Sequence, residues 1–272
     1  MSKKRRSTIL LLIVLITGLS VMLYPAVSDY WNSFHQSKAI SGYTDCVTNL
    51  EEAEYEKILN DAREYNKNLA SSINTYKLSE NEMDMYESLL NIDGNGMMGY
   101  IEIPSIQCSL PIYHGTNDTV LQFAIGHIEW SSLPVGGENT HCVLSGHRGN
   151  PSAKLFTNLD KLTEGDIFTI KVLNEVLTYE VDQILTVLPQ DSSALQIEKG
   201  KDYCTLVTCT PYGVNTHRLL VRGHRIENPE DASVNVSSEA IQIEPLLVVP
   251  FISIPILIFL IIFTSVSDRR KR

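Results

Sequence analysis

The sequence predicts a mainly β domain, a barrel or a sandwich, that is preceded by helices and flanked by membrane segments. Short apolar or alternating runs recur between residues 98 and 226, separated by clusters of Gly, Asn, Asp and Pro. This spacing is typical of an all-β domain. The preceding segment is polar with helical periodicity, and both ends combine an apolar run with a basic cluster. The 272 residues therefore provide one domain of ordinary size, residues 98–226, with appendages on both sides.

Strands are predicted where runs of β-branched and apolar residues are bounded by turn residues. A short helix is expected within the β domain over residues 152–162. The predicted strands are residues 100–103, 109–113, 141–144, 167–172, 176–188, 205–209 and 218–222.

A helical extension is predicted over residues 29–97. From Asn49 to Thr75 apolar residues recur at near-helical spacing in an otherwise polar sequence, which predicts an amphipathic helix. A second, shorter helix is predicted from Glu80 to Leu90, ending before a turn at residues 93–96. Such helices can pack on the β domain or mediate association.

Residues 1–28 predict a cytoplasmic basic end followed by a membrane segment or a signal peptide. Four basic residues at positions 3–6 precede an apolar run from Ile9 to Leu23, which extends to Val27 and is marginal in length for a full span. The tripeptide Ala-Val-Ser at 26–28 resembles a signal-peptide cleavage site, so cleavage is an alternative to an uncleaved anchor.

The uncharged run at residues 246–266 predicts a transmembrane helix, in which proline is tolerated. Residues 227–245 are expected to be a flexible tether, and residues 267–272 a basic cytoplasmic tail. With both basic clusters inside, the positive-inside rule places the segment from about residue 28 to residue 245 outside the cytoplasm. The expected location is the cell membrane, with an extracytoplasmic domain.

The charge of the chain excludes a basic nucleic-acid-binding surface. Without the four basic residues at each end and Asp268, the chain holds 14 basic and 31 acidic residues, a net charge of −17. The five cysteines are irregularly spaced and the histidines are scattered, so neither a disulfide framework nor a metal site is expected. Cys142 and Cys204 are expected to be small core residues. The sequence implies no cofactor.

A cysteine and an arginine are expected to face each other at the rim of the sheet. Residues 205–209 and 218–222 predict the strands of a hairpin joined by a loop rich in Pro, Gly and Asn. If Cys209 pairs opposite Arg218, the thiol lies beside a guanidinium that can stabilise a developing oxyanion. A thiol reacts as the thiolate and needs a base nearby. His147, at the exit of strand 141–144, is the best candidate for that base.

Other residues of the same types are expected to be structural. A cysteine at a strand end is usually a small hydrophobe unless a base and a cation accompany it. His127 is expected to be hydrogen-bonded, and His217 to point away from the face of Arg218. Arg148 and Arg222 are expected to be solvated or salt-bridged, with Arg222 the alternative if Arg218 is structural.

Several strings resemble the sortases, the membrane-anchored cysteine transpeptidases of Gram-positive bacteria. The likeness runs from about residue 98 to residue 225 and is carried by Thr-Leu-Val-Thr-Cys at 205–209, the following Arg218, and Ser-Gly-His-Arg at 145–148. It includes Gly-Tyr-Ile-Glu-Ile-Pro at 99–104, Leu-Pro-Ile-Tyr-His-Gly-Thr at 110–116 and Ser-Leu-Pro-Val-Gly-Gly at 132–137. The combination is most similar to class C, the pilin-polymerising branch. The resemblance implies an eight-stranded sortase barrel with Cys209 as nucleophile, His147 as acid/base and Arg218 as electrostatic stabiliser.

The resemblance also implies a reaction. The enzyme would cleave an LPxTG-like sorting signal between Thr and Gly through a thioacyl-enzyme, and transfer the acyl group to a lysine amine of a pilin, polymerising pili. One alternative is a sortase that attaches surface proteins to cell-wall peptide; another, of a different class, is a non-catalytic membrane-tethered assembly factor. The expected partners are LPxTG-bearing pilins or surface proteins, the acceptor lysine and the membrane.

Class C sortases often carry an Asp-Pro-aromatic lid over the active site. Residues 29–99 contain no such string, and the nearest acidic segment, Asp84-Met85-Tyr86, lacks the proline. The site is therefore expected to be open or covered by another segment.

Overall fold

The computed structural model describes residues 3–71, 78–150 and 152–228, with side chains from Ser7 onward. The chain divides after Ser28 into two units, of which the second begins at Asp29 and holds the β domain. The tether, the C-terminal membrane helix and the basic tail predicted for residues 227–272 lie outside the described residues, apart from positions 227 and 228.

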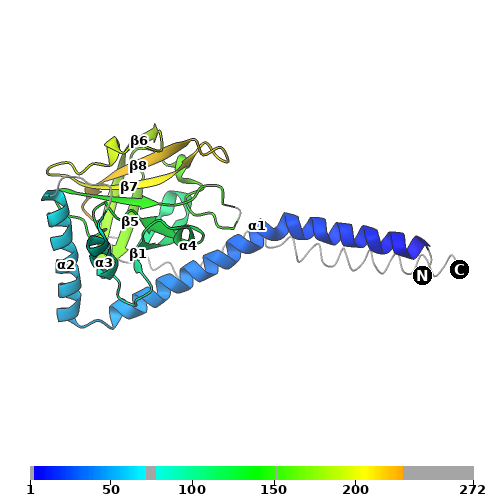
Figure 1. Ribbon diagram of the computed structural model, residues 1–272, viewed down its shortest axis with the longest axis horizontal. Helices are drawn as coiled ribbons and strands as arrows, with labels where there is room; N and C mark the ends of the chain where they lie inside the picture. Colours follow the sequence, from blue (N-terminus) through cyan, green and yellow to red (C-terminus); the bar gives the residue numbers. More distant parts are fainter. Residues whose placement is uncertain (1–2, 72–77, 151, 229–272) are drawn as a thin grey trace. The chain divides into compact units, whose positions relative to one another are not determined.

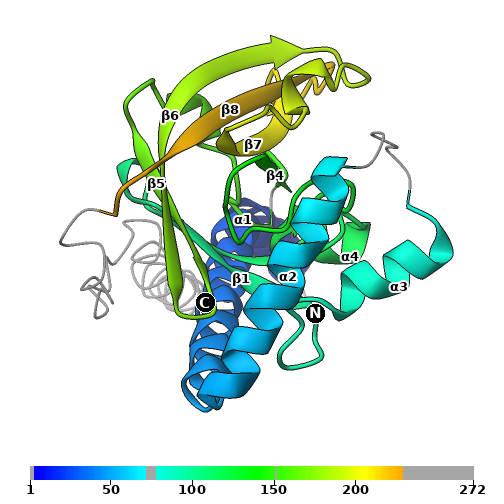
Figure 2. The same ribbon diagram turned by 90° about the vertical axis from the view of Figure 1, so that its left-hand side faces the viewer.

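Eight strands close into a barrel, which confirms the predicted fold class (Figures 1 and 2). They are β1 (Met97–Ile103), β2 (Cys108–His114), β3 (Ile125–His127), β4 (Thr140–Ser145), β5 (Ile167–Val172), β6 (Glu175–Val187), β7 (Asp202–Thr210) and β8 (His217–Ile226). Their order around the barrel is β1-β2-β3-β4-β7-β8-β6-β5. The pairs β2–β3 and β4–β7 are parallel and the other neighbours are antiparallel.

Every predicted strand is present, and β3 is additional because three residues are too few to show alternation. The helix predicted over residues 152–162 is wrong: the described residues there contain only a 3₁₀ turn, η2 (Leu159–Lys161). Leu155 has a φ of 37°, which a right-handed helix does not allow. The N–H of Phe156 donates instead to the carbonyl of His147, 3.1 Å away. This segment is therefore shaped by its contact with the end of β4.

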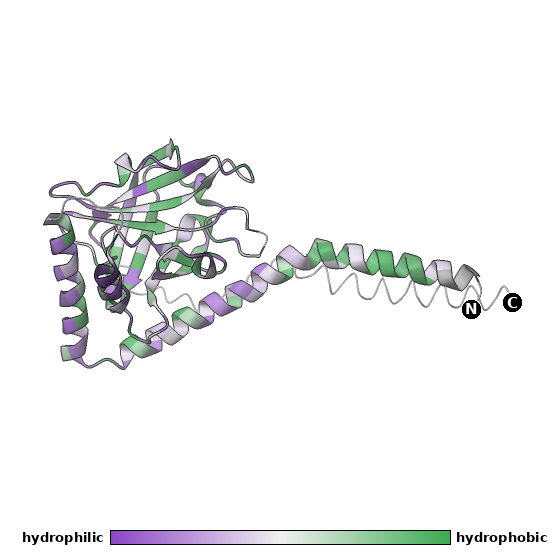
Figure 3. Ribbon diagram, in the orientation of Figure 1, coloured by the Kyte–Doolittle hydropathy of each residue, from purple (hydrophilic) through white to green (hydrophobic). Residues whose placement is uncertain are grey.

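Three longer helices precede the barrel: α1 (Lys3–Thr48), α2 (Glu52–Ser71) and α3 (Glu80–Ser88). The last two confirm the helices predicted for this extension. Helix α1 continues without a break through Pro25 and through residues 29–48. From Ser7 onward it is long and apolar enough to cross a membrane, and its apolar residues gather in its N-terminal part (Figure 3). Shorter helices within the barrel domain are η1 (Pro104–Ile106), α4 (Asp118–Leu121) and η3 (Ser193–Leu195).

Buried polar side chains fix each helix to the barrel. Tyr43 of α1 donates to the carbonyl of Met98 and accepts from the N–H of Leu173, both at 2.8 Å. Asn66 of α2 bonds both backbone groups of Leu133. In α3, the Tyr86 hydroxyl accepts from the N–H of Gly115 and lies 2.9 Å from His127 Nδ1. Buried hydrogen bonds of this kind stabilise the contact and also fix where each helix lies on the barrel.

Side chains of β4, β7 and β8 alternate between two apolar clusters. The larger cluster fills the barrel and the smaller one covers the outer face. On β7, Leu206 belongs to the first and Val207 to the second. The small outer cluster consists of Val143, Leu195, Val207 and Leu220.

Candidate active site

Cys209 and Arg218 form a cross-strand pair at the end of the β7–β8 hairpin. The Cα partners in this hairpin include Cys209 with Arg218 and Val207 with Leu220, which is the predicted register. Because Val207 and Leu220 lie in the outer cluster, alternation places Cys209 and Arg218 on this outer face. Both residues are half-buried, so the rim of the barrel holds them while solvent can still reach them.

His147 is positioned next to Cys209 by the parallel pairing of β4 with β7. The register pairs Ser145 with Val207, so two residues further along each chain come His147 and Cys209. The strand order β4-β7-β8 therefore puts His147 on one side of Cys209 and Arg218 on the other. The structure thus brings the three predicted residues to one edge of the sheet.

The backbone on either side of His147 is held tightly. The N–H of Gly146 donates to the Val207 carbonyl at 3.1 Å, and the hydroxyl of Thr208 donates to the Gly146 carbonyl at 2.7 Å. A Cβ at Gly146 would lie 2.8 Å from the ring of Phe156, so only glycine allows this ring to pack here. These contacts fix His147 on a rigid element, as an acid/base residue requires.

Arg148 connects the His147 loop to the strand that carries Cys209. Its guanidinium donates to the Thr210 hydroxyl at 3.2 Å and pairs with Asp160, and it lies 6.0 Å from the ring centre of Tyr212. Of the two environments expected for Arg148, solvated or salt-bridged, the structure shows the second. The two loops that flank Cys209 therefore touch each other.

Three other histidines of the barrel, His114, His127 and His141, are buried or half-buried and bonded away from Cys209. His127 is fully buried, between Tyr86 and the Ser132 carbonyl, which confirms its structural role. Burial lowers the pKa of His114 and of His141, and both rings have hydrogen-bond partners on both nitrogens. In contrast, the His147 ring has no hydrogen-bond partner among the described residues.

The two arginines of β8 have different surroundings. Arg222 makes a bidentate pair with Asp182, at 2.9 and 3.0 Å, and stacks 4.1 Å from the ring centre of Tyr203. Among the described residues, Arg218 bonds only the neighbouring backbone carbonyls of Asn215, at 3.4 Å, and His217, at 3.2 Å. Long bonds to neutral carbonyls are easily exchanged for a charged partner. Arg222 is therefore structural, and Arg218 is the arginine that a substrate can engage.

The remaining cysteines of the barrel are poor nucleophiles. Cys142 and Cys204 are buried, which confirms their prediction as core residues. Burial raises the pKa of the Cys204 thiol well above its usual value and that of Cys108 to about 12. A thiol that stays protonated does not attack a carbonyl. Cys142 differs: although burial opposes it, hydrogen bonds with Cys204 and His127 lower the pKa of its thiol, but the side chain is buried, so a substrate does not reach it. Within the barrel, Cys209 is thus the thiol that combines accessibility with a neighbouring base and cation.

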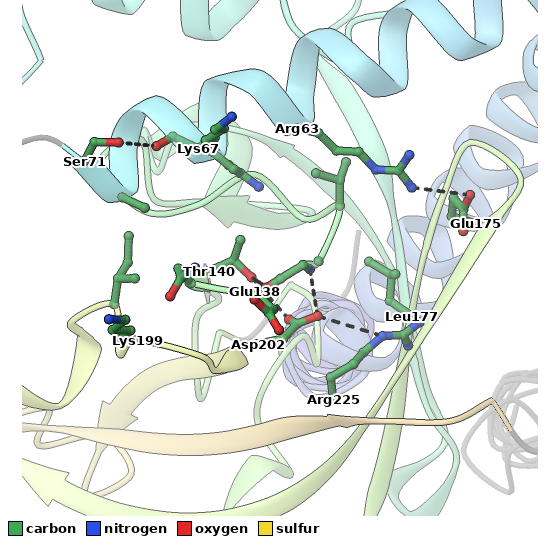
Figure 4. A pocket seen from close by; sticks show the side chains of 17 residues that line it. Arg63, Lys67, Ser71, Glu138, Thr140, Glu175, Leu177, Lys199, Asp202 and Arg225 are labelled. Carbon is green, nitrogen blue, oxygen red and sulfur yellow. Dashed lines mark hydrogen bonds and ion pairs between the residues drawn. The ribbon is translucent and has the colours of Figure 1, made fainter.

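A cavity of about 970 Å³ lies at the opposite end of β7, between α2 and the barrel (Figure 4). There Asp202 accepts from the N–H of Gly137 at 2.8 Å and from the hydroxyl of Tyr179 at 3.0 Å, and it pairs with Arg225 at 4.0 Å. Burial raises the pKa of Asp202. Cys209 is seven positions after Asp202 on the strand, about 23 Å away, so this cavity is not part of the edge that holds Cys209.

Sequence reasoning missed two contributors to the site. Thr208 holds Gly146, and Arg148 holds Thr210; both contacts join segments about 60 residues apart in the chain. The string Thr-Cys and the dipeptide His-Arg were visible, but nothing in either pattern encodes the long-range partner. Whether a segment covers Cys209 stays a prediction, because residues 72–77 lie outside the described part of the chain.

Comparisons with known proteins agree on one family. The sortase domain model matches residues 101–226. Sortase C1 from Streptococcus agalactiae is 58% identical, with a TM-score of 0.69, over 71% of this chain and 100% of that one. Sortase C of Clostridium perfringens, solved with the C-terminal cell wall sorting motif, is 44% identical. The TM-score is 0.63, and the match covers 71% of this chain and 100% of that one. Sortase C of Streptococcus pneumoniae is 45% identical, with a TM-score of 0.62, over 70% of this chain and 97% of that one. Its structure is described as giving insight into pilin substrate specificity.

Curated relatives named sortase A or sortase D are 25–32% identical, and the match spans 58–63% of their length. The barrel, the motif order and these similarities lead to the same result. The chain belongs to the sortase family, and the solved structures that it resembles at 44–58% identity are class C sortases.

Proposed function

We propose that the protein is a cysteine transpeptidase that joins pilin subunits by acyl transfer. The observation that carries this proposal is the placement of one accessible thiol, Cys209, between the guanidinium of Arg218 and the loop of His147. This arrangement supplies a nucleophile, an acid/base and an oxyanion donor from three adjacent strands.

In the first half-reaction, the Cys209 thiolate attacks the carbonyl carbon of Thr in an LPxTG-like sorting signal. Arg218 gives up its weak carbonyl bonds and donates to the oxyanion. As the C–N bond to Gly breaks, His147 protonates the leaving amine. The product is a thioester between the Thr acyl group and Cys209.

In the second half-reaction, a lysine amine of the next pilin attacks this thioester. His147 accepts the proton from the attacking amine, the C–S bond breaks, and an isopeptide bond and the Cys209 thiolate result, which restores the starting protonation state. The sorting motif bound to sortase C of Clostridium perfringens supports the donor assignment. The link of the Streptococcus pneumoniae enzyme to pilin specificity supports a pilin substrate.

The apolar part of α1 supports a place at the cell membrane, with the barrel outside the cytoplasm. A membrane-held barrel meets substrates that are delivered at the same surface. Retention of residues 1–28 as an anchor and the C-terminal span at 246–266 both belong to this proposal.

Acceptor competition tests the proposed function. The full-length chain, reconstituted in vesicles, receives an LPxTG peptide together with equal amounts of a pilin-derived lysine peptide and a cell-wall peptide amine, and the products are identified by mass spectrometry. We expect the isopeptide with the lysine peptide to dominate. Exclusive joining to the cell-wall peptide would replace polymerisation by wall anchoring. Absence of any cleavage would contradict the transpeptidase and favour the non-catalytic assembly factor.

A further inference from the structure

Residues 29–38 of α1 have two opposite faces. On a helix with 3.6 residues per turn, Asp29, Asn32 and Gln36 share one side, and Tyr30, Trp31 and Phe34 share the other. The first three hold the barrel domain, and the second three are exposed to solvent by 56–62%. We define the exposed side, Tyr30, Trp31 and Phe34, as the aromatic face.

The polar face is bonded to loops of the barrel domain. Asp29 accepts from the N–H of Lys154 at 2.8 Å and pairs with its ammonium at 3.3 Å. Asn32 donates to the carbonyl of Ser152 at 2.7 Å, and Gln36 to that of Phe123 at 2.6 Å. These bonds fix the rotation of α1, so the aromatic face points away from the barrel domain.

The aromatic face follows directly after the apolar run of the same helix. Residues 9–27 span about 28 Å at 1.5 Å per residue, close to the roughly 30 Å of a hydrocarbon core. Trp31 comes four residues after Val27, about 6 Å at the rise of a helix, so it falls at the depth of the headgroup layer if residues 9–27 cross the hydrocarbon core. Tyr and Trp are enriched in this layer because their rings combine an apolar body with a polar edge.

One cationic residue, Lys38, lies on the same side of the helix as the aromatic face. Lys38 is exposed and lies on the side of Trp31 and Phe34, about one turn beyond the latter and about 16 Å beyond Val27, from where its long side chain can reach back toward the phosphates of a membrane surface. Asp45, exposed on this side of α1, comes seven residues later, about 10 Å beyond Lys38 and outside the headgroup layer. On this side of the helix, a cation therefore lies near residues 30–38 and an anion only further along, so an anionic lipid surface is favoured at residues 30–38.

We propose that the aromatic face of α1, with Lys38, is a docking surface for the phospholipid headgroup layer. The proposal rests on residues 1–28 remaining as an anchor and is independent of the transpeptidase chemistry. Docking would hold the loop with Ser152 and Lys154, which follows His147, close to the membrane surface. The active site would then be presented at a fixed height above the bilayer.

Fluorescence quenching tests this docking, because the chain has two tryptophans, Trp31 and Trp130. Full-length Trp130→Phe, which keeps Trp31, is reconstituted in phosphatidylcholine and phosphatidylglycerol vesicles whose acyl chains are brominated near the headgroup or near the chain end. We expect quenching by the first lipid to exceed that by the second by at least about twofold, because an interfacial residue lies about 5–10 Å into the headgroup boundary. Co-flotation with vesicles establishes insertion separately.

The matched control is Trp31→Phe, which keeps Trp130 in the barrel domain and should show no quenching by either lipid. If Trp130→Phe does not fold, the difference between the wild-type protein and Trp31→Phe gives the same signal. Quenching of Trp31 no stronger than that of Trp130 in inserted protein would overturn the proposal. Peptide cleavage measured on the same vesicles distinguishes this outcome from failure of the proposed function.

Discussion

The reactive side chains at the two ends of strand β7 differ in their hydrogen-bond partners. At the Asp202 end, the carboxylate bonds Gly137, Tyr179 and Arg225. At the Cys209 end, the thiol has no hydrogen-bond partner among the described residues. Buried polar groups in proteins are normally satisfied, so groups left available at a rigid rim are candidates for binding substrate. The difference separates a structural end from a functional end on one strand.

The two arginines of β8 repeat this contrast. Arg222 bonds a carboxylate in bidentate fashion and stacks on an aromatic ring, whereas the described partners of Arg218 are the neutral backbone carbonyls of Asn215 and His217. Charge is therefore a poor guide to function on this strand. The partner of each charge is the better guide, and each partner can be tested by substitution.

The largest expected effect follows from removing the thiol. Cys209→Ala should lower turnover of an LPxTG peptide by at least about 10³-fold, because no other group can form the thioester. The fold should be retained, since a small half-buried side chain is replaced by a smaller one. Turnover and circular dichroism of the two full-length proteins check this, and near-wild-type turnover would remove Cys209 from the mechanism.

A smaller effect is expected from Arg218→Lys. An ammonium cannot reproduce the planar fork of donors, and loss of one oxyanion donor costs about 3 kcal/mol, roughly 10²-fold in kcat. Arg222→Lys is the matched control: it should lower the free energy of unfolding through the lost Asp182 pair but leave kcat per folded molecule nearly unchanged. If the two variants exchange these behaviours, Arg222 is the oxyanion donor and the comparison is wrong.

Asp202→Asn should affect stability and spare catalysis. Its NH2 group would replace one of the two carboxylate oxygens and face either the Gly137 N–H or the Tyr179 hydroxyl, which leaves a buried donor poorly satisfied at a cost of about 1–3 kcal/mol. Urea unfolding measures the loss, and kcat per folded molecule should stay within about twofold because the carboxyl is about 23 Å from Cys209. A selective loss of kcat would mean that the two ends are coupled.

The smallest effect concerns pH. Burial lowers the folded-state pKa of His141 below its unfolded value of about 6.5. Its contribution to stability is therefore complete above pH 6.5 and is lost as pH falls toward the folded-state pKa, with a slope of at most about 1.4 kcal/mol per pH unit. Unfolding free energies between neutral and mildly acidic pH should fall less steeply for His141→Asn than for the wild-type protein. Equal slopes would assign the acid sensitivity to other groups, such as His114.

Local sequence patterns could predict the strands and the hairpin register. Apolar alternation and the Pro/Gly/Asn loop between residues 209 and 218 are sufficient to place Cys209 opposite Arg218. The short strand β3 was not predicted because it has only three residues. The helix expected over residues 152–162 is absent because the N–H of Phe156 bonds the backbone of His147 instead. Both differences arise where tertiary contacts decide local structure.

The position of His147 beside Cys209 could not be derived from periodicity. It depends on the parallel pairing of β4 with β7, whose residues are about 60 positions apart; the sequence offered only the place of His147 at a strand exit and the family resemblance. The same holds for the pairing of Arg222 with Asp182, which joins β8 to β6. Long-range partners decide which residues of a motif remain available, and the sequence pattern contains no record of them.

The most direct test of the central claim is to trap the acyl-enzyme. Full-length protein is mixed with an LPxTG peptide in the absence of an amine acceptor, quenched in acid, and examined by intact-mass and peptide-mapping mass spectrometry. The account predicts a mass increase equal to the peptide portion ending at Thr, located on Cys209, and absent from Cys209→Ala. An adduct on another cysteine, or cleavage with no adduct and no dependence on Cys209, would contradict it.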